Sequence, residues 1–261
     1  MQNYWQKQTA DKPSFPDLLW SRPENKNQAG KLLIVGGNVH GFAAAGEAYT
    51  EATRSGIGTA RVLLPDSLQK TVGKVFEAGE YAPSSASGSF SQTALAEMLA
   101  TASWADATLL AGDFGRNSET AILLEKFTEK YQGQLTITQD ALDYFTKSDQ
   151  ILRRENTLLV MSFAQLQKVA KNASFPIAFT HEMDFLRLVD ALHQFTTKYC
   201  STVVVKRDDT YYAATSGKVI TTLVKASAKI WRVQTASSAA VWWLQNPSKV
   251  LESIGTSLVT D

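Results

Sequence analysis

The sequence predicts an α/β protein whose sheet is mainly parallel and is covered by helices on both faces. Three observations support this class. Apolar runs of strand length alternate with runs of helical composition along most of the chain. Glycine clusters follow some of these apolar runs, and near the C-terminus apolar runs succeed one another with only short turns between them. Alternating strands and helices form parallel sheets, whereas strands joined by short turns form antiparallel meanders.

The first strand, helix and strand are the clearest. Residues 31–35 are an apolar run that ends in Gly36-Gly37, residues 43–55 have helical composition, and residues 59–64 are apolar again. The alternation continues with helices at residues 91–103 and 118–131 and strands at residues 107–111, 134–138 and 157–161. Strands at residues 202–206, 210–214 and 219–224 form an antiparallel edge meander, and helices at residues 237–244 and 247–258 close the chain.

The chain is expected to form one domain. Its 261 residues suffice for a single large core, and 44% are hydrophobic and 20% charged, as in ordinary globular domains. Residues 1–30 are polar and rich in Pro, Asn, Gln and Lys, which predicts an N-terminal arm packed on the surface. Regular structure is expected from Lys31 onward, with residues 31–261 as the single domain.

Charge and composition exclude several classes of function. Lys and Arg number 26 against 25 Asp and Glu, so no broad basic field is present to bind nucleic acid or an acidic membrane. The chain has neither a secretory leader nor eighteen consecutive apolar residues, which predicts a cytoplasmic protein. The single cysteine, Cys200, is expected to be a buried, inert thiol, and none of the three histidines has a partner at metal-ligand spacing. No metal site is therefore predicted.

Two glycine-rich loops follow strands, at residues 36–41 and 111–116. Ligands of open α/β sheets bind at the carboxyl ends of strands, where these loops lie. The first loop matches neither the dinucleotide fingerprint nor the Walker A loop, and it either holds an anion on backbone N–H groups or is a plain tight turn. In the second loop, Asp113 and Arg116 either pair with each other at the surface or face a ligand.

Five segments carry a family resemblance. They read Gly36-Gly37-Asn38, Ala43-Ala44, Arg54-Ser55-Gly56-Ile57-Gly58, Ala111-Gly112-Asp113-Phe114-Gly115-Arg116 and Thr138-Gln139-Asp140-Ala141-Leu142. Together they resemble the ribokinase-like NAD(P)H-hydrate dehydratases, which use ADP or ATP to repair hydrated nicotinamide cofactors. The resemblance spans nearly the whole chain and implies a three-layer α/β/α sandwich. It also implies substrate-binding roles for Gly37, Asn38, Ala44, Asp113, Gly115 and Asp140.

The phosphate-binding motif of that family is altered. Its Thr-Gly-Gly-Ser-Gly-Asp forms an anion hole at a helix N-terminus, and the aspartate activates the attacking hydroxyl; here the segment reads Thr235-Ala236-Ser237-Ser238-Ala239-Ala240. Ala240 thus occupies the position of the catalytic aspartate, and no catalytic residue is assigned. The resemblance still implies a place for the phosphates of ADP or ATP, with Mg, at Lys206, Thr235, Ala236, Ser237, Ser238 and Ala239. A methyl group accepts no proton, and loss of a general base costs about 10²–10⁴ in rate.

Further family positions are lost as well. Ser162 and Gln165 stand in place of a histidine and a glutamate, and Arg207 replaces a glycine. We therefore expect a divergent, catalytically impaired relative that retains at most the binding of a nucleotide or a nicotinamide cofactor, NAD(P)H or its hydrate. The alternative is an active, nucleotide-dependent hydro-lyase in which Asp113 or Asp140 serves as the base. The expected partners are a small-molecule ligand and a second copy of the chain in a homo-oligomer.

Overall fold

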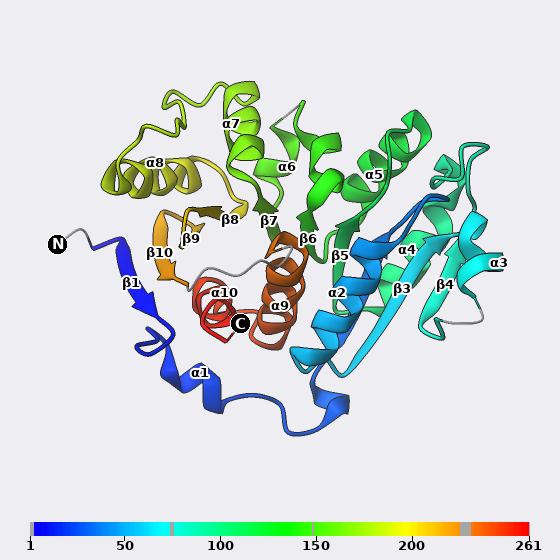
Figure 1. The fold of residues 1–261 in the computed structure, drawn as a ribbon, viewed down its shortest axis with the longest axis horizontal. Helices are drawn as coiled ribbons and strands as arrows, with labels where there is room; N and C mark the ends of the chain where they lie inside the picture. Colours follow the sequence, from blue (N-terminus) through cyan, green and yellow to red (C-terminus); the bar gives the residue numbers. More distant parts are fainter. Residues whose placement is uncertain (1–2, 74–75, 148, 225–230, 261) are drawn as a thin grey trace.

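A computed structural model describes residues 3–73, 76–147, 149–224 and 231–260. Its strands are β1 (Trp5–Thr9), β2 (Lys31–Gly36), β3 (Thr59–Pro65), β4 (Gly79–Ala82), β5 (Ala107–Gly112), β6 (Gln134–Thr138), β7 (Thr157–Met161), β8 (Thr202–Arg207), β9 (Thr210–Thr215) and β10 (Lys218–Leu223). They form one sheet in the order β1-β10-β9-β8-β7-β6-β5-β2-β3-β4 (Figure 1).

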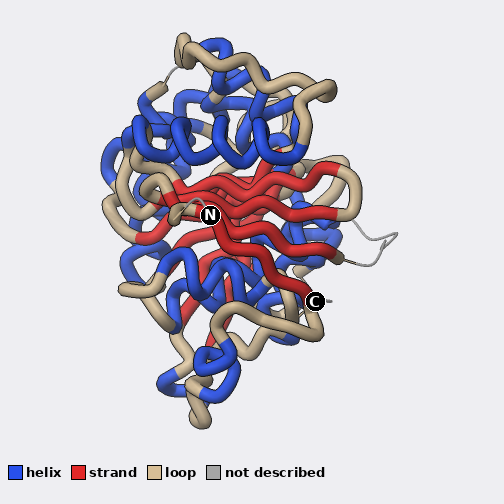
Figure 2. Tube along the Cα trace, turned by 90° about the vertical axis from the view of Figure 1, so that its left-hand side faces the viewer, coloured by secondary structure: helices blue, strands red, loops and turns tan. Residues whose placement is uncertain are grey.

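Helices cover both faces of this sheet (Figures 1 and 2). They are α1 (Pro16–Trp20), α2 (Ala43–Arg54), α3 (Gln69–Val72), α4 (Leu95–Trp104), α5 (Ser118–Lys130), α6 (Gln150–Arg153), α7 (Phe163–Asn172), α8 (Phe185–Lys198), α9 (Trp231–Gln245) and α10 (Val250–Ser257). The core on one face contains side chains of α2, α3, α9 and α10, and the core on the other contains those of α4, α5, α7 and α8. The predicted three-layer α/β/α class is confirmed.

The strands of the sheet's interior are apolar throughout because both of their faces are buried. In β2, Leu33 and Val35 belong to one core, whereas Leu32 and Ile34 belong to the other. Strands buried on both sides are expected to show continuous apolar runs rather than alternation. This is why the inner strands could be predicted from composition.

The direction in which the chain crosses the sheet reverses at β2. Strands β3 and β4 follow on one side of β2, whereas β5, β6, β7 and β8 follow in order on the other, all in parallel pairs. Strand order reverses between β2 and β5, and such a switch point leaves a crevice at the carboxyl ends of the two strands. The predicted antiparallel meander is confirmed in β8, β9 and β10.

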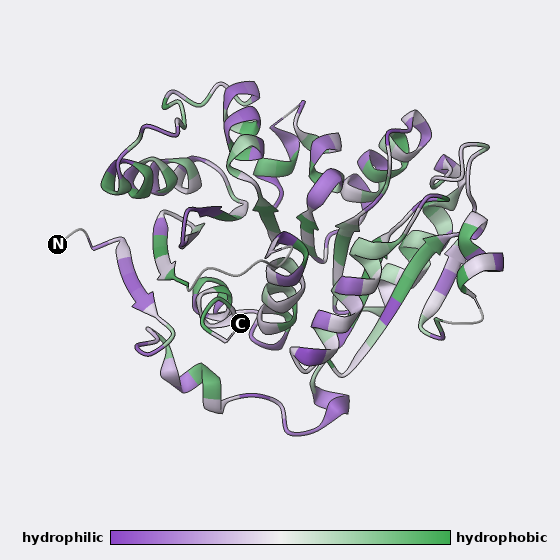
Figure 3. Cartoon of the chain, in the orientation of Figure 1, coloured by the Kyte–Doolittle hydropathy of each residue, from purple (hydrophilic) through white to green (hydrophobic). Residues whose placement is uncertain are grey.

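The N-terminal arm contributes a strand, so the expectation that regular structure starts at Lys31 is wrong. Strand β1 pairs in parallel with β10 and extends the sheet beyond the meander. Gln8 is buried and donates its amide to Thr222 Oγ1 at 2.8 Å and to the Gly255 carbonyl at 2.7 Å. The strand is polar in sequence and appears purple in Figure 3. Side-chain hydrogen bonds therefore help to attach it to the sheet, where apolar packing attaches the inner strands.

Cys200 is exposed, and the expectation of a buried thiol is also wrong. It lies in the connection between α8 and β8, two positions before the buried strand begins. No helix among the described residues combines the length and apolar character needed to cross a membrane.

Candidate functional site

The loops after β2 and β5 touch each other through glycine backbone at the switch point. The Gly37 N–H donates to the Gly112 carbonyl at 3.0 Å. A Cβ on Gly36 would stand 2.5 Å from that same carbonyl oxygen, and Gly112 has φ +127°. Side chains are excluded at both positions, so the two loops are held in direct backbone contact.

Asp113 joins these loops to the start of α2. Its Oδ2 accepts the Ala44 N–H at 2.7 Å, and its carbonyl accepts from Asn38 Nδ2 at 2.6 Å. The residue before α2, Phe42, gives the helix no side-chain cap, so Asp113 supplies one from 69 residues away. The structure therefore brings Gly37, Asn38, Ala44 and Asp113 together, as the resemblance implies. The carboxylate of Asp113 occupies the place at the helix N-terminus where an anion would bind.

Asp140 lies at the other side of the second loop, on the 3₁₀ helix η4 (Gln139–Phe145) that follows β6. Its Oδ2 accepts the Gly115 N–H at 3.1 Å. Oδ1 is buried and accepts no hydrogen bond of normal geometry from the described residues, although the amides of Asp113 and Phe114 also stabilise the charge. Burial raises the pKa of Asp140 above its ordinary value, and the amide hydrogen bonds and the neighbouring Asp113 are smaller influences.

This raised pKa predicts a pH dependence of stability. Asp140 binds its proton more tightly in the folded chain than in the unfolded chain, so its contribution to the free energy of unfolding falls as the pH rises above about 4. In Asp140→Asn this loss is absent, so the variant gains stability relative to the parent chain from pH 4 to pH 8. Urea unfolding midpoints of both proteins across this range measure the difference. Parallel pH profiles would contradict the assignment.

The altered phosphate motif lies inside a helix. Helix α9 is continuous from Trp231, its first described residue, to Gln245, so the expectation of a helix starting near Ser237 is wrong. In an α-helix only the N–H groups of the first turn lack intrahelical partners, and residues 235–239 lie more than one turn beyond the first described residue of α9. The amides of residues 235–239 are therefore bonded to carbonyls one turn earlier. The structure therefore places this segment within a helix and not at its N-terminus, and its role in phosphate binding stays a prediction.

The small residues of this segment serve helix packing. Ala236, Ala239 and Ala240 are buried in the same core as the alanines of α2, against which α9 packs. Ser237 is also buried, and its hydroxyl donates to the Ala48 carbonyl at 2.6 Å. Small side chains allow two helices to approach closely, so this composition has a structural reason of its own.

A polar network that sequence reasoning missed connects α9 to α7 and η4. Gln165 forms the capping box of α7 with Ser162, and its Oε1 accepts from Arg232 at 3.0 Å. Its side-chain NH₂ donates to the Gln139 carbonyl at 2.8 Å and to Asp143 at 3.1 Å. Burial lowers the pKa of Arg232, and the charges of Asp143 and Asp140 oppose that shift. Gln165, which stands in place of the family's glutamate, thus connects three elements, α7, α9 and η4, by hydrogen bonds.

Lys206 lies near the start of α9 through an aromatic contact. Its ammonium nitrogen is 5.3 Å from the centre of the Tyr211 ring, which in turn packs on Trp231 at 5.4 Å. This contact is a cation–π interaction with Tyr211. The role of Lys206 in phosphate binding stays a prediction.

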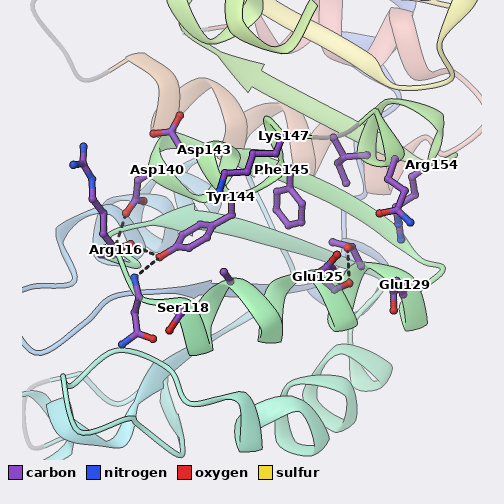
Figure 4. Close-up of a pocket in the computed structure, with 16 residues that line it drawn as sticks. Arg116, Ser118, Glu125, Glu129, Asp140, Asp143, Tyr144, Phe145, Lys147 and Arg154 are labelled. Atoms are coloured by element: carbon purple, nitrogen blue, oxygen red, sulfur yellow. Dashed lines mark hydrogen bonds between the residues drawn. The ribbon is translucent and has the colours of Figure 1, made fainter. Parts of the chain in front are cut away.

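A cavity of about 940 Å³ opens between α5 on one side and η4 with α6 on the other (Figure 4). Its lining residues are Gly115, Arg116, Asn117, Ser118, Ala121, Glu125, Thr128, Glu129, Asp140, Asp143, Tyr144, Phe145, Lys147, Gln150, Ile151 and Arg154. Of the predicted substrate-binding residues, Gly115 and Asp140 line this cavity. The volume matches those of small-molecule sites.

Comparison with known proteins gives a likeness in structure alone. No protein-family model matches the chain, and no curated protein matches it in sequence. A ribokinase-like superfamily protein from Enterococcus faecalis is similar with a TM-score of 0.74 at 15% identity, over 99% of this chain and 86% of that one. The ADP/ATP-dependent NAD(P)H-hydrate dehydratase of Bacillus subtilis, crystallised with ATP and Mg²⁺, is similar with a TM-score of 0.63 at 10% identity, over 94% of this chain and 85% of that one.

A third structure extends the comparison to kinases. The pyridoxal kinase of Bacillus subtilis, an ADP complex, gives a TM-score of 0.57 at 9% identity over 87% of this chain and 88% of that one. The chain therefore has the ribokinase-like α/β fold. Its structural neighbours include an NAD(P)H-hydrate dehydratase, which confirms the resemblance at the level of the fold.

Proposed function

We propose that this chain is a catalytically silent relative of the NAD(P)H-hydrate dehydratases that binds a nucleotide or a nicotinamide cofactor. The continuous helix α9 carries the first half of this proposal. Ala240 is 1% exposed and lies within that helix, nine residues after Trp231. Neither the base nor the phosphate donors implied by the family resemblance are available there.

Two further backbone anion positions are filled by the protein's own carboxylates. Asp113 caps α2, and Asp140 accepts from the amide of Gly115 with support from the two preceding amides. Backbone amides that already bind a carboxylate are not free to stabilise the charge of a transferring phosphate. These contacts support a loss of nucleotide-dependent catalysis.

The retained cavity supports the binding half of the proposal. One end of it lies at the carboxyl ends of β5 and β6, where the predicted residues Gly115 and Asp140 line it, and it is large enough for a nucleoside or a nicotinamide riboside. Similar structures hold ATP or ADP, which favours a ligand of this chemical class.

Asp140 favours a second candidate, an active dehydratase with a displaced base. A half-buried carboxylate of raised pKa that lines a cavity is a recurrent feature of catalytic bases. Asp143 and Asp140 are also close enough to the first turn of α9 to influence the pKa of Arg232.

A dehydratase assay distinguishes these candidates. Purified protein is given hydrated NADH with ADP or ATP, and the return of NADH absorbance is followed. We expect no turnover above the protein-free rate for either the parent chain or Asp140→Asn. Turnover that disappears in Asp140→Asn would establish the second candidate, and turnover that survives in it would contradict both assignments. Calorimetry with ADP, ATP and NADH tests binding, and no heat at millimolar ligand would remove the binding role.

A further inference from the structure

We infer that the cavity beside Asp140 binds a planar nitrogen heterocycle that bears an NH₂ group, the ring end of a nucleoside, and leaves any phosphates outside. This inference rests on the proposed binding function and specifies which part of the ligand enters. Adenine and the carboxamide ring of nicotinamide share this chemistry.

The middle of the cavity suits a flat ring. Tyr144 and Phe145 face α5 across the space in Figure 4, and Ala121 presents only a methyl group from the helix opposite. The Tyr144 hydroxyl donates to the Gly115 carbonyl, which anchors that ring beside Asp140. Ile151 adds apolar surface to the same wall. Aromatic side chains opposite an open helix face provide stacking surface for a planar ligand.

The end of the cavity beside Gly115 presents an acceptor. Oδ2 of Asp140 accepts one hydrogen bond, from Gly115, and a carboxylate oxygen has a second lone pair for a ligand N–H. Its burial makes such a bond stronger than one formed in water. A ring NH₂ meets this requirement, whereas a ring carbonyl would place its lone pair against a carboxylate.

The charges around the cavity disfavour phosphate inside. The start of α5 is capped by Asn117, whose Oδ1 accepts the Glu119 and Thr120 N–H groups at 2.7 and 3.3 Å, so these donors are engaged. The terminal nitrogens of Arg154 donate to backbone carbonyls, among them that of Gly133 at 2.9 Å. Carboxylates in the lining further repel an anion. They are Asp140, Asp143, Glu125 and Glu129.

The remaining cations lie at the rim. Arg116 and Lys147 line the cavity and are exposed to solvent. Exposed cations in water attract an anion only weakly, because solvent and salt screen them. Phosphates attached to a bound nucleoside would therefore lie in solvent near these residues and contribute little affinity.

Titration calorimetry at pH 8 tests the inference with five ligands. We expect adenosine to bind, inosine to bind about 10- to 100-fold more weakly because a carbonyl oxygen replaces the exocyclic NH₂ group, and ADP to bind within about threefold of adenosine. Nicotinamide riboside against nicotinic acid riboside, in which a carboxylate replaces the carboxamide, shows whether the natural ring is the nicotinamide. If only one of the two ligand pairs shows a preference for the NH₂-bearing ring, that pair identifies the natural ring as adenine or nicotinamide.

Variants then assign the preference to one residue. Asp140→Asn keeps the shape of the side chain and is expected to bring adenosine and inosine within about threefold of each other. Asp143→Asn, a neighbour in the same lining, is the matched control and should retain the preference. If Asp140→Asn does not fold, the ligand series on the parent protein still decides.

The outcomes separate this inference from the proposed function. Equal binding of adenosine and inosine, or ADP binding more than tenfold tighter than adenosine, would overturn the ring assignment and leave the nucleotide-binding role intact. Absence of binding by every nucleoside, nucleotide and cofactor would overturn both.

Discussion

Replacing Ala240 by Asp will leave the protein without dehydratase activity and will lower the free energy of unfolding by about 3–5 kcal/mol. The family's aspartate acts at the head of a helix, but position 240 lies in the interior of α9, 1% exposed and surrounded by the apolar core shared with α2. A carboxylate there would lose its hydration among the apolar side chains of this core. Urea unfolding measures the stability, and the absorbance assay with hydrated NADH measures the activity.

The matched control is Ala240→Ser, which adds one polar atom and no charge. Because a serine hydroxyl in a helix can donate to the carbonyl one turn earlier, we expect this variant to lose only about 1 kcal/mol. If Ala240→Asp regained activity with stability close to that of the parent, the first turns of α9 would have to open, and the silent assignment would be wrong.

The second large effect is expected at Gly112, where Ala should destabilise the protein by about 2–4 kcal/mol. Gly112 ends β5 with φ +127°, a conformation that residues with a side chain rarely adopt, and a Cβ would lie 2.7 Å from the Cβ of Gln139. Relief of this contact would move η4, and with it Asp140. The thermal midpoint and the affinity for adenosine should therefore fall together.

Gly41→Ala is the control for this substitution. Gly41 belongs to the neighbouring loop, its φ lies outside the left-handed region, and an added Cβ would have no atom within 4 Å. The expected change in stability is within about 0.5 kcal/mol. Similar losses in the two variants would show that the backbone contact at Gly112 has no special role.

Much of the sheet could be predicted because its interior strands are buried on both faces. Strands β6 and β7 occur at the predicted residues, and the meander differs by single positions. Strand β1 escaped prediction because Trp5–Thr9 is polar and is held by side-chain hydrogen bonds to distant residues. Strand β4 has four residues, too few to show a periodic pattern.

Site residues could be predicted from the sequence only where they lie in loops that directly follow strands. Gly37, Asn38, Ala44 and Asp113 meet because they lie at the carboxyl ends of β2 and β5, which adjoin in the sheet. The bond from Arg232 to Gln165 joins residues 67 positions apart, and nothing in the spacing indicates it. The start of α9 was misplaced because the family motif suggested a helix that begins near Ser237, whereas the helix already includes Trp231.

Strand β1 ties the order of synthesis to the order of folding. Strand β1 is synthesised long before β10, its one partner strand among the described residues, and Gln8 contacts Gly255 in α10. Its partners are translated more than 200 residues later, since Trp5 and Thr221 alone are 216 positions apart. The outer edge of β10 thus has no partner until β1 pairs with it. Removal of β1 would leave that edge free to pair with another molecule.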